Sequence, residues 1–443
     1  MLDRLHDIHC CTYHNIGEEL LWATSMPCIV GGDASIPIAE YGTSNVGWMK
    51  HVYRRGLDWR YGRAMQAISG IHFNYSFSDE FLAALQSVEG DPRGEQAFRS
   101  KAYFALIRNF QRYGWIVPYL FGASPAICKS FTQGENLHFE EFREHTFYEP
   151  WATSLRMSDI GYKNRAQAAL NISYNDLDDY VAGLLRAIST PDPDYERIGT
   201  FVDGEWRQLN THLLQIENEY YSFVRPKAVA RSGEKPTSAL RRAGVEYVEI
   251  RALDVNPFQP LGIGTEQMLF METLLLFCLL EDSPPVHPHE RGRINRNQGL
   301  VARRGRDPTL DLTRGDGRQV RLVQWAGELF DALEAAALLL DDGNRTSSYQ
   351  GNLSVLRLRV EAPQQTPSAR VLAEMRERDE EFVQFAMRIS KAYRERFVSE
   401  PLPDETRDRF VQTARESIAD QQRLERSDEL SFEAYLAAYF RDG

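Results

Sequence analysis

Two segments in which polar and apolar side chains alternate constrain the fold of this chain most strongly. In residues 71–77, apolar or aromatic side chains occupy every second position, and His72 and Asn74 stand between them. Successive side chains of a β-strand point to opposite faces of the sheet. The segment therefore predicts a strand with one face in a core and the other open to water or a ligand.

Residues 245–255 show the same alternation. Valine, isoleucine and alanine side chains would point one way, whereas Glu249 and Arg251 would point the other. Antiparallel sheets commonly bury one face and leave the other exposed. We therefore predict that the two strands lie in one antiparallel sheet, with His72 and Glu249 facing the same cavity. An open face with these side chains is a plausible floor for a reaction.

The side chains of His72, Glu249 and Arg251, and that of Arg156 in the segment 152–162, also have simpler interpretations. A single histidine such as His72 is more often structural than a ligand. Glu249 and Arg251 at neighbouring positions of one strand face often form a surface ion pair, which contributes little to stability. A loop arginine such as Arg156 is ordinarily solvated, although its planar guanidinium can also hold a carboxylate by two parallel hydrogen bonds.

The character of the sequence changes near residue 282. Residues 283–319 are rich in Pro, Gly and Arg, and they predict a long surface connection that follows a mixture of helices and short strands. We expect an α+β fold in which 1–282 carry the sheet and the candidate site, and 283–443 add the Arg-rich connection and a helical region to the same continuous domain. The predicted helices are 2–23, 96–114, 175–189, 265–281, 324–341, 368–397 and 404–440.

Charge and composition exclude several classes of protein. The formal net charge is −12, and the only Arg-rich stretch, 291–306, reads as a solvated loop, so we expect no nucleic-acid partner. The first residues lack the pattern of a signal peptide, and the most apolar stretch, 268–280, is too short to span a bilayer. Five scattered cysteines do not suggest a disulfide framework, which favours a reducing compartment. We therefore expect a soluble, cytoplasmic protein with no membrane partner.

Three weaker motifs are set aside. His6, His9, Cys10 and Cys11 have the chemistry of metal ligands at helical spacing, but a structural zinc site needs four ligands that converge. The pair of glycines at 262 and 264 lacks the remainder of a dinucleotide fingerprint. The sequence also contains no P-loop.

Long strings of this sequence, in their order along the chain, resemble the proteobacterial type of glutamate–cysteine ligase. The resemblance is dense to about residue 281 and thin afterwards. The matching strings are SMPC at 25–28, YGTSN at 41–45, YRRGLDWRYG at 53–62, MQAISGIHFNYS at 65–76, GWIVPYLFGASPAIC at 114–128, ATSLRMSDIGY at 152–162, LQIENEYY at 214–221, RPK at 225–227 and VEYVEIRALDVNPFQP at 245–260.

This resemblance implies a fold similar to that of glutamine synthetase, in which a curved antiparallel sheet forms a funnel packed by helices. It also implies the activity, the first step of glutathione biosynthesis. ATP phosphorylates the γ-carboxylate of glutamate, and the amine of cysteine then displaces phosphate from the γ-glutamyl phosphate. Metal ions and arginine are needed in such chemistry, because phosphate and carboxylate are both anions. The implied cofactors are therefore ATP and Mg²⁺.

The resemblance also gives roles to individual residues. His72 and Glu249 match Mg²⁺ ligands, and Arg251 matches the arginine at the transferring phosphoryl group, which makes it the expected catalytic residue. The expected substrate-binding residues are Arg156 at a substrate carboxylate, Asn74 and Gln66 on the substrate wall, and Tyr53, Tyr162 and Tyr221 in the cysteine pocket.

Members of this family begin with a stretch that this sequence does not contain, and that stretch carries a strand with two glutamates flanking an arginine. Because those carboxylates belong to the family's metal site, we expect the 443 residues alone to have little ligase activity. The alternative is a catalytically silent relative that binds amino acid or nucleotide and acts through a partner. The retained Tyr53, Arg156, Glu249 and Arg251 favour the ligase, since a silent relative has no chemical need for them.

Overall fold

The structure is a computed structural model that describes residues 1–28, 30–132, 139–161, 170, 172–231 and 233–441. Among the described residues helices predominate, and four small antiparallel sheets lie between them. The α+β class predicted from the sequence is confirmed. Within the described ranges, no helix is long and apolar enough to cross a membrane.

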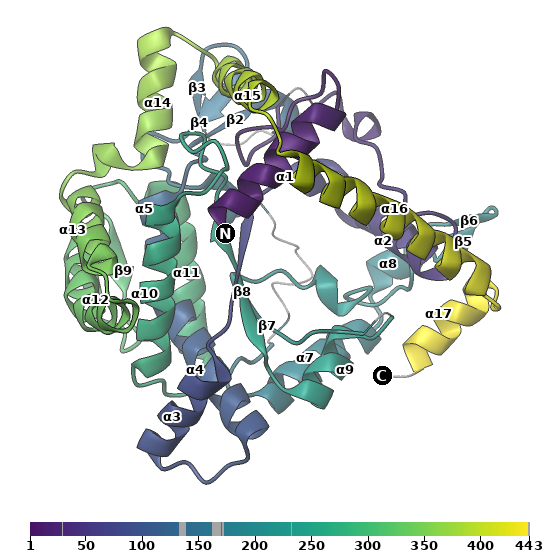
Figure 1. Ribbon diagram of the computed structural model, residues 1–443, viewed down its shortest axis with the longest axis horizontal. Helices are drawn as coiled ribbons and strands as arrows, with labels where there is room; N and C mark the ends of the chain where they lie inside the picture. The colour runs from purple at the N-terminus through teal and green to yellow at the C-terminus, as the bar shows by residue number, and fades with distance from the viewer. Residues whose placement is uncertain (29, 133–138, 162–169, 171, 232, 442–443) are drawn as a thin grey trace.

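A three-stranded sheet occupies the centre of the molecule (Figure 1). Its strand order is β1 (Ile71–Tyr75), β8 (Tyr247–Leu253), β7 (Val224–Lys227), and both pairings are antiparallel. The predicted pairing of the first two strands is confirmed. β7 lies at the edge, where a proline such as Pro226 is tolerated because no further strand needs its missing N–H group.

The apolar face of this sheet packs into the main core. Phe73, Val248 and Ile250 are buried there. Helix α4 (Glu95–Tyr113) contacts β7 and β8, and α10 (Thr265–Leu280) packs on α4. Helix α10 is apolar on nearly every side, which is typical of a helix surrounded by protein. Its outer side is covered by α12 (Leu322–Asn344) and α13 (Ser348–Glu361) (Figure 1).

The remaining elements surround this centre. The other strands are β2 (Ala126–Cys128), β3 (Glu140–Phe142), β4 (Thr146–Tyr148), β5 (Phe201–Val202), β6 (Glu205–Trp206), β9 (Asp311–Thr313) and β10 (Gln319–Arg321). The other helices are α1 (Leu2–Asn15), α2 (Asn45–Tyr61), α3 (Asp79–Glu89), α5 (Ile116–Phe121), α7 (Leu177–Ser189), α8 (Pro193–Ile198), α9 (Pro236–Ala243), α11 (Pro288–Arg304), α14 (Pro367–Arg378), α15 (Phe382–Ser399), α16 (Asp404–Ser427) and α17 (Phe432–Arg441). Short 3₁₀ turns are η1 (Asp33–Ser35), η2 (Ala64–Ala67), η3 (Lys129–Thr132), η4 (Leu155–Met157), η5 (Glu217–Glu219) and η6 (Pro363–Gln365).

The prediction that 283–319 are a surface connection is wrong for most of its length. Residues 288–304 form α11, whose first residue is a proline, and a β9–β10 hairpin follows. Nor are its arginines a solvated loop. Arg303 contacts the carboxylates of Glu149 and Asp159, and Arg306 is buried and donates to the carbonyl of Ala152. Contacts with residues far away in the sequence therefore hold this segment in place.

Three predicted helices are shorter or divided. Helix α1 ends at Asn15 rather than residue 23, since Gly17 follows with positive φ. The helix expected over 368–397 divides into α14 and α15 at Asp379, whose left-handed conformation ends α14. The helix expected over 404–440 divides into α16 and α17.

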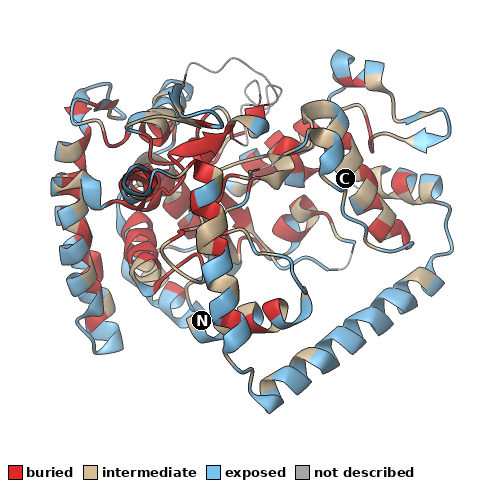
Figure 2. Cartoon of the chain, turned by 90° about the horizontal axis from the view of Figure 1, so that it is seen from above, coloured by how far each residue is buried: buried red, intermediate tan, exposed pale blue. Residues whose placement is uncertain are grey.

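The main core contains residues from both sides of position 282, from Phe73 to Val360. This sharing supports our proposal that 1–282 and 283–443 form one continuous domain. Figure 2 shows the buried residues in the interior, whereas α16 has no buried residue along its length.

A disulfide joins Cys28 to Cys128 on β2, with their Cα atoms 5.4 Å apart. Cys10, Cys11 and Cys278 are free thiols. The sequence analysis did not identify this bridge, because its two cysteines are separated by 100 positions and only the fold brings them together.

The packing of α10 gives a test of the core. Phe270 is fully buried and contacts Phe121 and Phe330, so Phe270→Ala should lower the free energy of unfolding by about 3–5 kcal/mol through lost contacts and a cavity. Leu339→Ala in α12, where Leu339 is exposed, is the matched control and should change it by less than about 0.5 kcal/mol. Urea unfolding measures both values, and equal effects would contradict this account of the core.

Candidate active site

A pocket of about 450 Å³ opens on the polar face of the central sheet. Its floor comes from all three strands, and its wall comes from α2 and the η5 turn region. The described residues that line it are Tyr41, Met49, Lys50, Tyr53, Arg54, His72, Ile216, Asn218, Arg225, Lys227, Glu249 and Arg251.

The strand register places Glu249 at the middle of this floor. Across one interface Asn74 is its partner on β1, and across the other Arg225 is its partner on β7. One carboxylate oxygen of Glu249 lies 3.6 Å from Nδ1 of His72 and 3.8 Å from Nζ of Lys227. The prediction that His72 and Glu249 face one cavity is confirmed.

The charges of the floor control the ionisation of Glu249. Burial alone would raise the pKa of this carboxyl, but the hydrogen bond from His72 and the cations Lys227, Arg225 and Arg251 outweigh burial and lower the pKa to about 2. Burial lowers the pKa of the Lys227 amine, and Arg225 and Arg251 lower it further while Glu249 opposes them. Glu249 is therefore ionised at neutral pH and holds the cations together.

Positive charge dominates the pocket. Among the described lining residues, Glu249 is the single carboxylate, against the five basic side chains of Lys50, Arg54, Arg225, Lys227 and Arg251. A cleft lined by one sign of charge raises the local concentration of ligands of the opposite sign. The arrangement suits a ligand with several negative charges, such as a polyphosphate or a dicarboxylate.

Two tyrosines extend the site. Tyr53 lies on α2, and burial, with Glu219 nearby, raises the pKa of its phenol, so the hydroxyl stays neutral and can donate a hydrogen bond. The ring of Tyr221 lies 5.0 Å from the guanidinium carbon of Arg251, a cation–π contact. The hydroxyl of Tyr221 donates to the sulfur of Met157 at 3.5 Å.

Arg156 is buried at the end of the sheet. Its Nε donates to Asp254 at 2.7 Å, and one terminal nitrogen donates to the backbone carbonyl of Arg251 at 3.2 Å. Asp254 also accepts hydrogen bonds from the hydroxyl of Ser154 and the backbone N–H of Ala123. Arg156 thus supports the strand that carries Arg251, and its expected contact with a substrate carboxylate stays a prediction.

The other residues expected to bind substrate are Asn74, Gln66 and Tyr162. Asn74 is exposed and lies opposite Glu249. Gln66 is in η2, where its amide donates to the carbonyl of Arg54 at 3.5 Å. Tyr162 lies outside the residues that the structure describes. The substrate-binding roles of these residues stay predictions.

Sequence analysis missed four of the basic residues. Arg225 and Lys227 appeared only within the matching string RPK, although they belong to strand β7 and alternate onto its polar face. Lys50 and Arg54 are four residues apart on α2, the spacing that puts two side chains on one face of a helix. That spacing, beside Tyr53, is the signal that could have revealed them.

Comparison with known proteins gives consistent findings. A family model described as "Glutamate-cysteine ligase" matches residues 1–301. The glutamate–cysteine ligase of Pseudomonas entomophila is 48% identical over 99% of this chain and 83% of its own length. That of Azotobacter vinelandii is 49% identical over 99% of this chain and 82% of its own. The crystal structure of the Francisella tularensis glutamate–cysteine ligase in complex with AMP is similar with a TM-score of 0.92 at 36% identity, covering 100% of this chain and 86% of that one.

The low pKa of Glu249 predicts a specific dependence of stability on pH. A carboxyl whose pKa falls from 4.5 to about 2 on folding stabilises the protein above pH 4.5, and this contribution is lost as pH falls toward 2. Glu249→Gln should therefore reduce the free energy of unfolding by up to about 3 kcal/mol at pH 7. The difference from wild type should shrink below about pH 4.5.

Urea unfolding at pH 7, 5, 4 and 3.5 measures this difference. Glu205→Gln is the control, because Glu205 is exposed and pairs with Arg55 at the surface. It should change the free energy of unfolding by less than about 0.5 kcal/mol. A Glu249→Gln effect that stays constant down to pH 3.5 would show that the carboxylate is not held ionised by its neighbours.

Proposed function

The chain belongs to the glutamate–cysteine ligase family, and from this premise we propose that its pocket joins the γ-carboxylate of glutamate to the amine of cysteine at the expense of ATP. The observation that carries the proposal is the group of five basic side chains around Glu249. The alternative of a silent relative is not favoured, because relatives 48% and 49% identical over 99% of this chain are named glutamate–cysteine ligases.

The reaction has two steps, and each involves anions that repel one another. First, the γ-carboxylate oxygen of glutamate forms a bond to the terminal phosphorus of ATP, and the bond from phosphorus to ADP breaks. The cysteine amine then attacks the acyl carbon, phosphate leaves, and the nitrogen loses a proton. Fixed cations act most strongly where charge develops in a site that excludes water. Lys227, Arg225 and Arg251 supply such charges on the sheet floor.

Arg251 is proposed as the catalytic residue that contacts the transferring phosphoryl group. Its planar guanidinium can donate two parallel hydrogen bonds to phosphate oxygens. The ring of Tyr221 and the backbone at Phe223, whose carbonyl accepts from the Arg251 N–H at 2.9 Å, fix its position. Tyr53 and Tyr221 are proposed to border the cysteine, with Tyr162 beyond the described residues.

The remaining substrate contacts are proposals from the family resemblance. Asn74 and Gln66 would face glutamate, and Arg156 would contact a substrate carboxylate in addition to its ion pair with Asp254.

The donor set of the floor fits Mg²⁺ bound together with a nucleotide. Mg²⁺ prefers oxygen ligands, and it is commonly held by one or two carboxylates with phosphate oxygens and water completing its coordination. Glu249 would provide the carboxylate, and His72, 3.6 Å from it, the neighbouring nitrogen. When bound, the ion offsets negative charge on the phosphates.

The binding partners and the cellular location of the enzyme belong to the same proposal. Its partners would be small molecules, namely glutamate, cysteine and ATP. A cytoplasmic location, expected from the sequence, is part of the proposal.

Phosphate release tests the proposed reaction. With ATP, Mg²⁺, glutamate and cysteine present, release should exceed background, and omission of either amino acid should abolish the dipeptide detected by mass spectrometry. Because the resemblance implies an additional acidic strand, the assay includes this chain and a version preceded by the N-terminal segment of the Pseudomonas entomophila relative. Higher activity of the longer version is expected, whereas inactivity of both would favour the silent relative.

The role of Arg251 has its own test. Arg251→Lys keeps the charge and loses the planar fork, so turnover should fall by about two to three orders of magnitude, with a much smaller change in KM. Arg197→Lys is the control, because Arg197 is exposed and pairs with Asp194 at the surface. Steady-state kinetics on the active version measure both variants. Unaltered turnover of Arg251→Lys would show that Arg251 is only an ion-pair partner within the sheet and has no catalytic role.

A further inference from the structure

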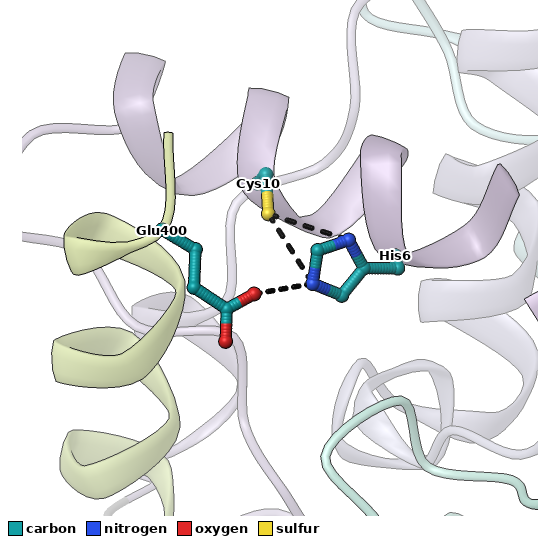
Figure 3. A group of neighbouring side chains, drawn as sticks. All are labelled: His6, Cys10 and Glu400. Carbon is teal, nitrogen blue, oxygen red and sulfur yellow. Dashed lines mark hydrogen bonds and ion pairs between the residues drawn. The ribbon is translucent and has the colours of Figure 1, made fainter. Parts of the chain in front are cut away.

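A second group of chemically reactive side chains lies where helix α1 packs against the end of α15. His6 and Cys10 belong to α1, and Glu400 directly follows α15 (Figure 3). One ligand atom from each lies within 4.8 Å of the other two. Among the described residues that line the pocket on the sheet, none belongs to this group.

The three donor atoms lie close together. The sulfur of Cys10 is 3.8 Å from both ring nitrogens of His6, and Nε2 also contacts a carboxylate oxygen of Glu400. Zinc holds nitrogen at about 2.0 Å and thiolate sulfur at about 2.3 Å in a tetrahedral arrangement, so its ligand atoms lie about 3.3–3.8 Å apart. The sulfur–nitrogen distance already fits. The nitrogen–oxygen contact needs only a small opening to admit an ion.

Packing around the group holds it in place. His6 and Cys10 are four residues apart, which puts them on one face of α1. The ring of Phe397 on α15 packs against His6 and lies parallel to Tyr13. Glu400 uses its other oxygen to accept from Nε of Arg396 at 2.9 Å, a contact that orients the carboxylate and can persist when a cation is bound.

Exposure allows an ion to enter from solvent. Cys10 is 1% exposed, whereas the side chains of His6 and Glu400 are 36% and 32% exposed. The sulfur therefore forms the floor of the site and the other two donors form its rim. Three protein donors leave one tetrahedral position for water.

We propose that His6, Cys10 and Glu400 bind a divalent transition-metal ion of the zinc class. The combination of sulfur, imidazole nitrogen and carboxylate oxygen selects such a metal, whereas Mg²⁺ and Ca²⁺ prefer oxygen ligands alone. The bound ion fastens α1 to the end of α15 and thus joins segments separated by 394 positions in the sequence. With three protein donors and one water position, the site is open rather than a closed four-ligand structural zinc site, and its role is independent of the ligase reaction.

Cobalt provides a direct test on the purified protein. Co²⁺ bound by a thiolate gives an intense near-ultraviolet charge-transfer band, which a cobalt ion bound only by His72 or Glu249 does not give. Wild type should show the band and Cys10→Ser should lose it. Cys11→Ser is the matched control, because Cys11 is the next residue on α1 and lies outside the group, and it should keep the band.

Zinc affinity and thermal unfolding complete the test. Competition with a chromophoric chelator should show zinc binding weakened at least about 10-fold in His6→Asn and Glu400→Gln. Zinc should raise the melting temperature of wild type and Cys11→Ser, and not that of Cys10→Ser. Unfolding without metal checks that each variant folds. No charge-transfer band in wild type, a band that survives Cys10→Ser, or one that needs Cys11 would each overturn the proposal and leave His6–Glu400 as an ion pair only.

Discussion

The position of Glu249 at the centre of three paired strands is the interaction on which the site depends. Arg225, Lys227 and Arg251 lie close together on one sheet floor, an arrangement that like charges oppose. The ionised Glu249 offsets this repulsion, and the register of β1, β8 and β7 fixes it where it can do so. The pocket keeps a net positive charge after this compensation. This net positive charge attracts an anionic ligand.

The core and the contacts of Asp254 hold strand β8 in this arrangement. The apolar face of β8 packs into the same core as α10, and the strand ends at Leu253, directly before Asp254. Asp254 is fully buried, and it binds Arg156, Ser154 and the backbone of Ala123. A buried ion pair is costly to break, because removal of one partner leaves an uncompensated charge. The site and the core therefore constrain β8 on both faces, and the contacts of Asp254 hold its C-terminal end.

The sequence predicted those parts of the molecule that depend on local pattern. Alternation identified β1 and β8, and it predicted that His72 and Glu249 share a cavity. It did not predict the α11 helix, because the arginines of 288–304 have their partners in distant segments such as Glu149. The basic residues of β7 were missed because that strand has only four residues and contains a proline. His6 and Cys10 were set aside because a structural zinc site needs four converging ligands, and the sequence could not show that Glu400, 394 positions from His6, lies beside them. The roles of the site residues came from the family resemblance, since strand patterns give the direction of a side chain but not its substrate.

The central claim is that the phosphates of ATP bind against the cationic floor around Glu249. A crystal structure of the protein with Mg²⁺, glutamate and a non-hydrolysable ATP analogue tests it most directly. The account predicts terminal phosphate oxygens about 3 Å from the side-chain nitrogens of Arg251 and from Arg225 or Lys227, with the metal ion between phosphate and Glu249. Phosphates bound at another surface, with this floor unchanged and empty, would contradict it.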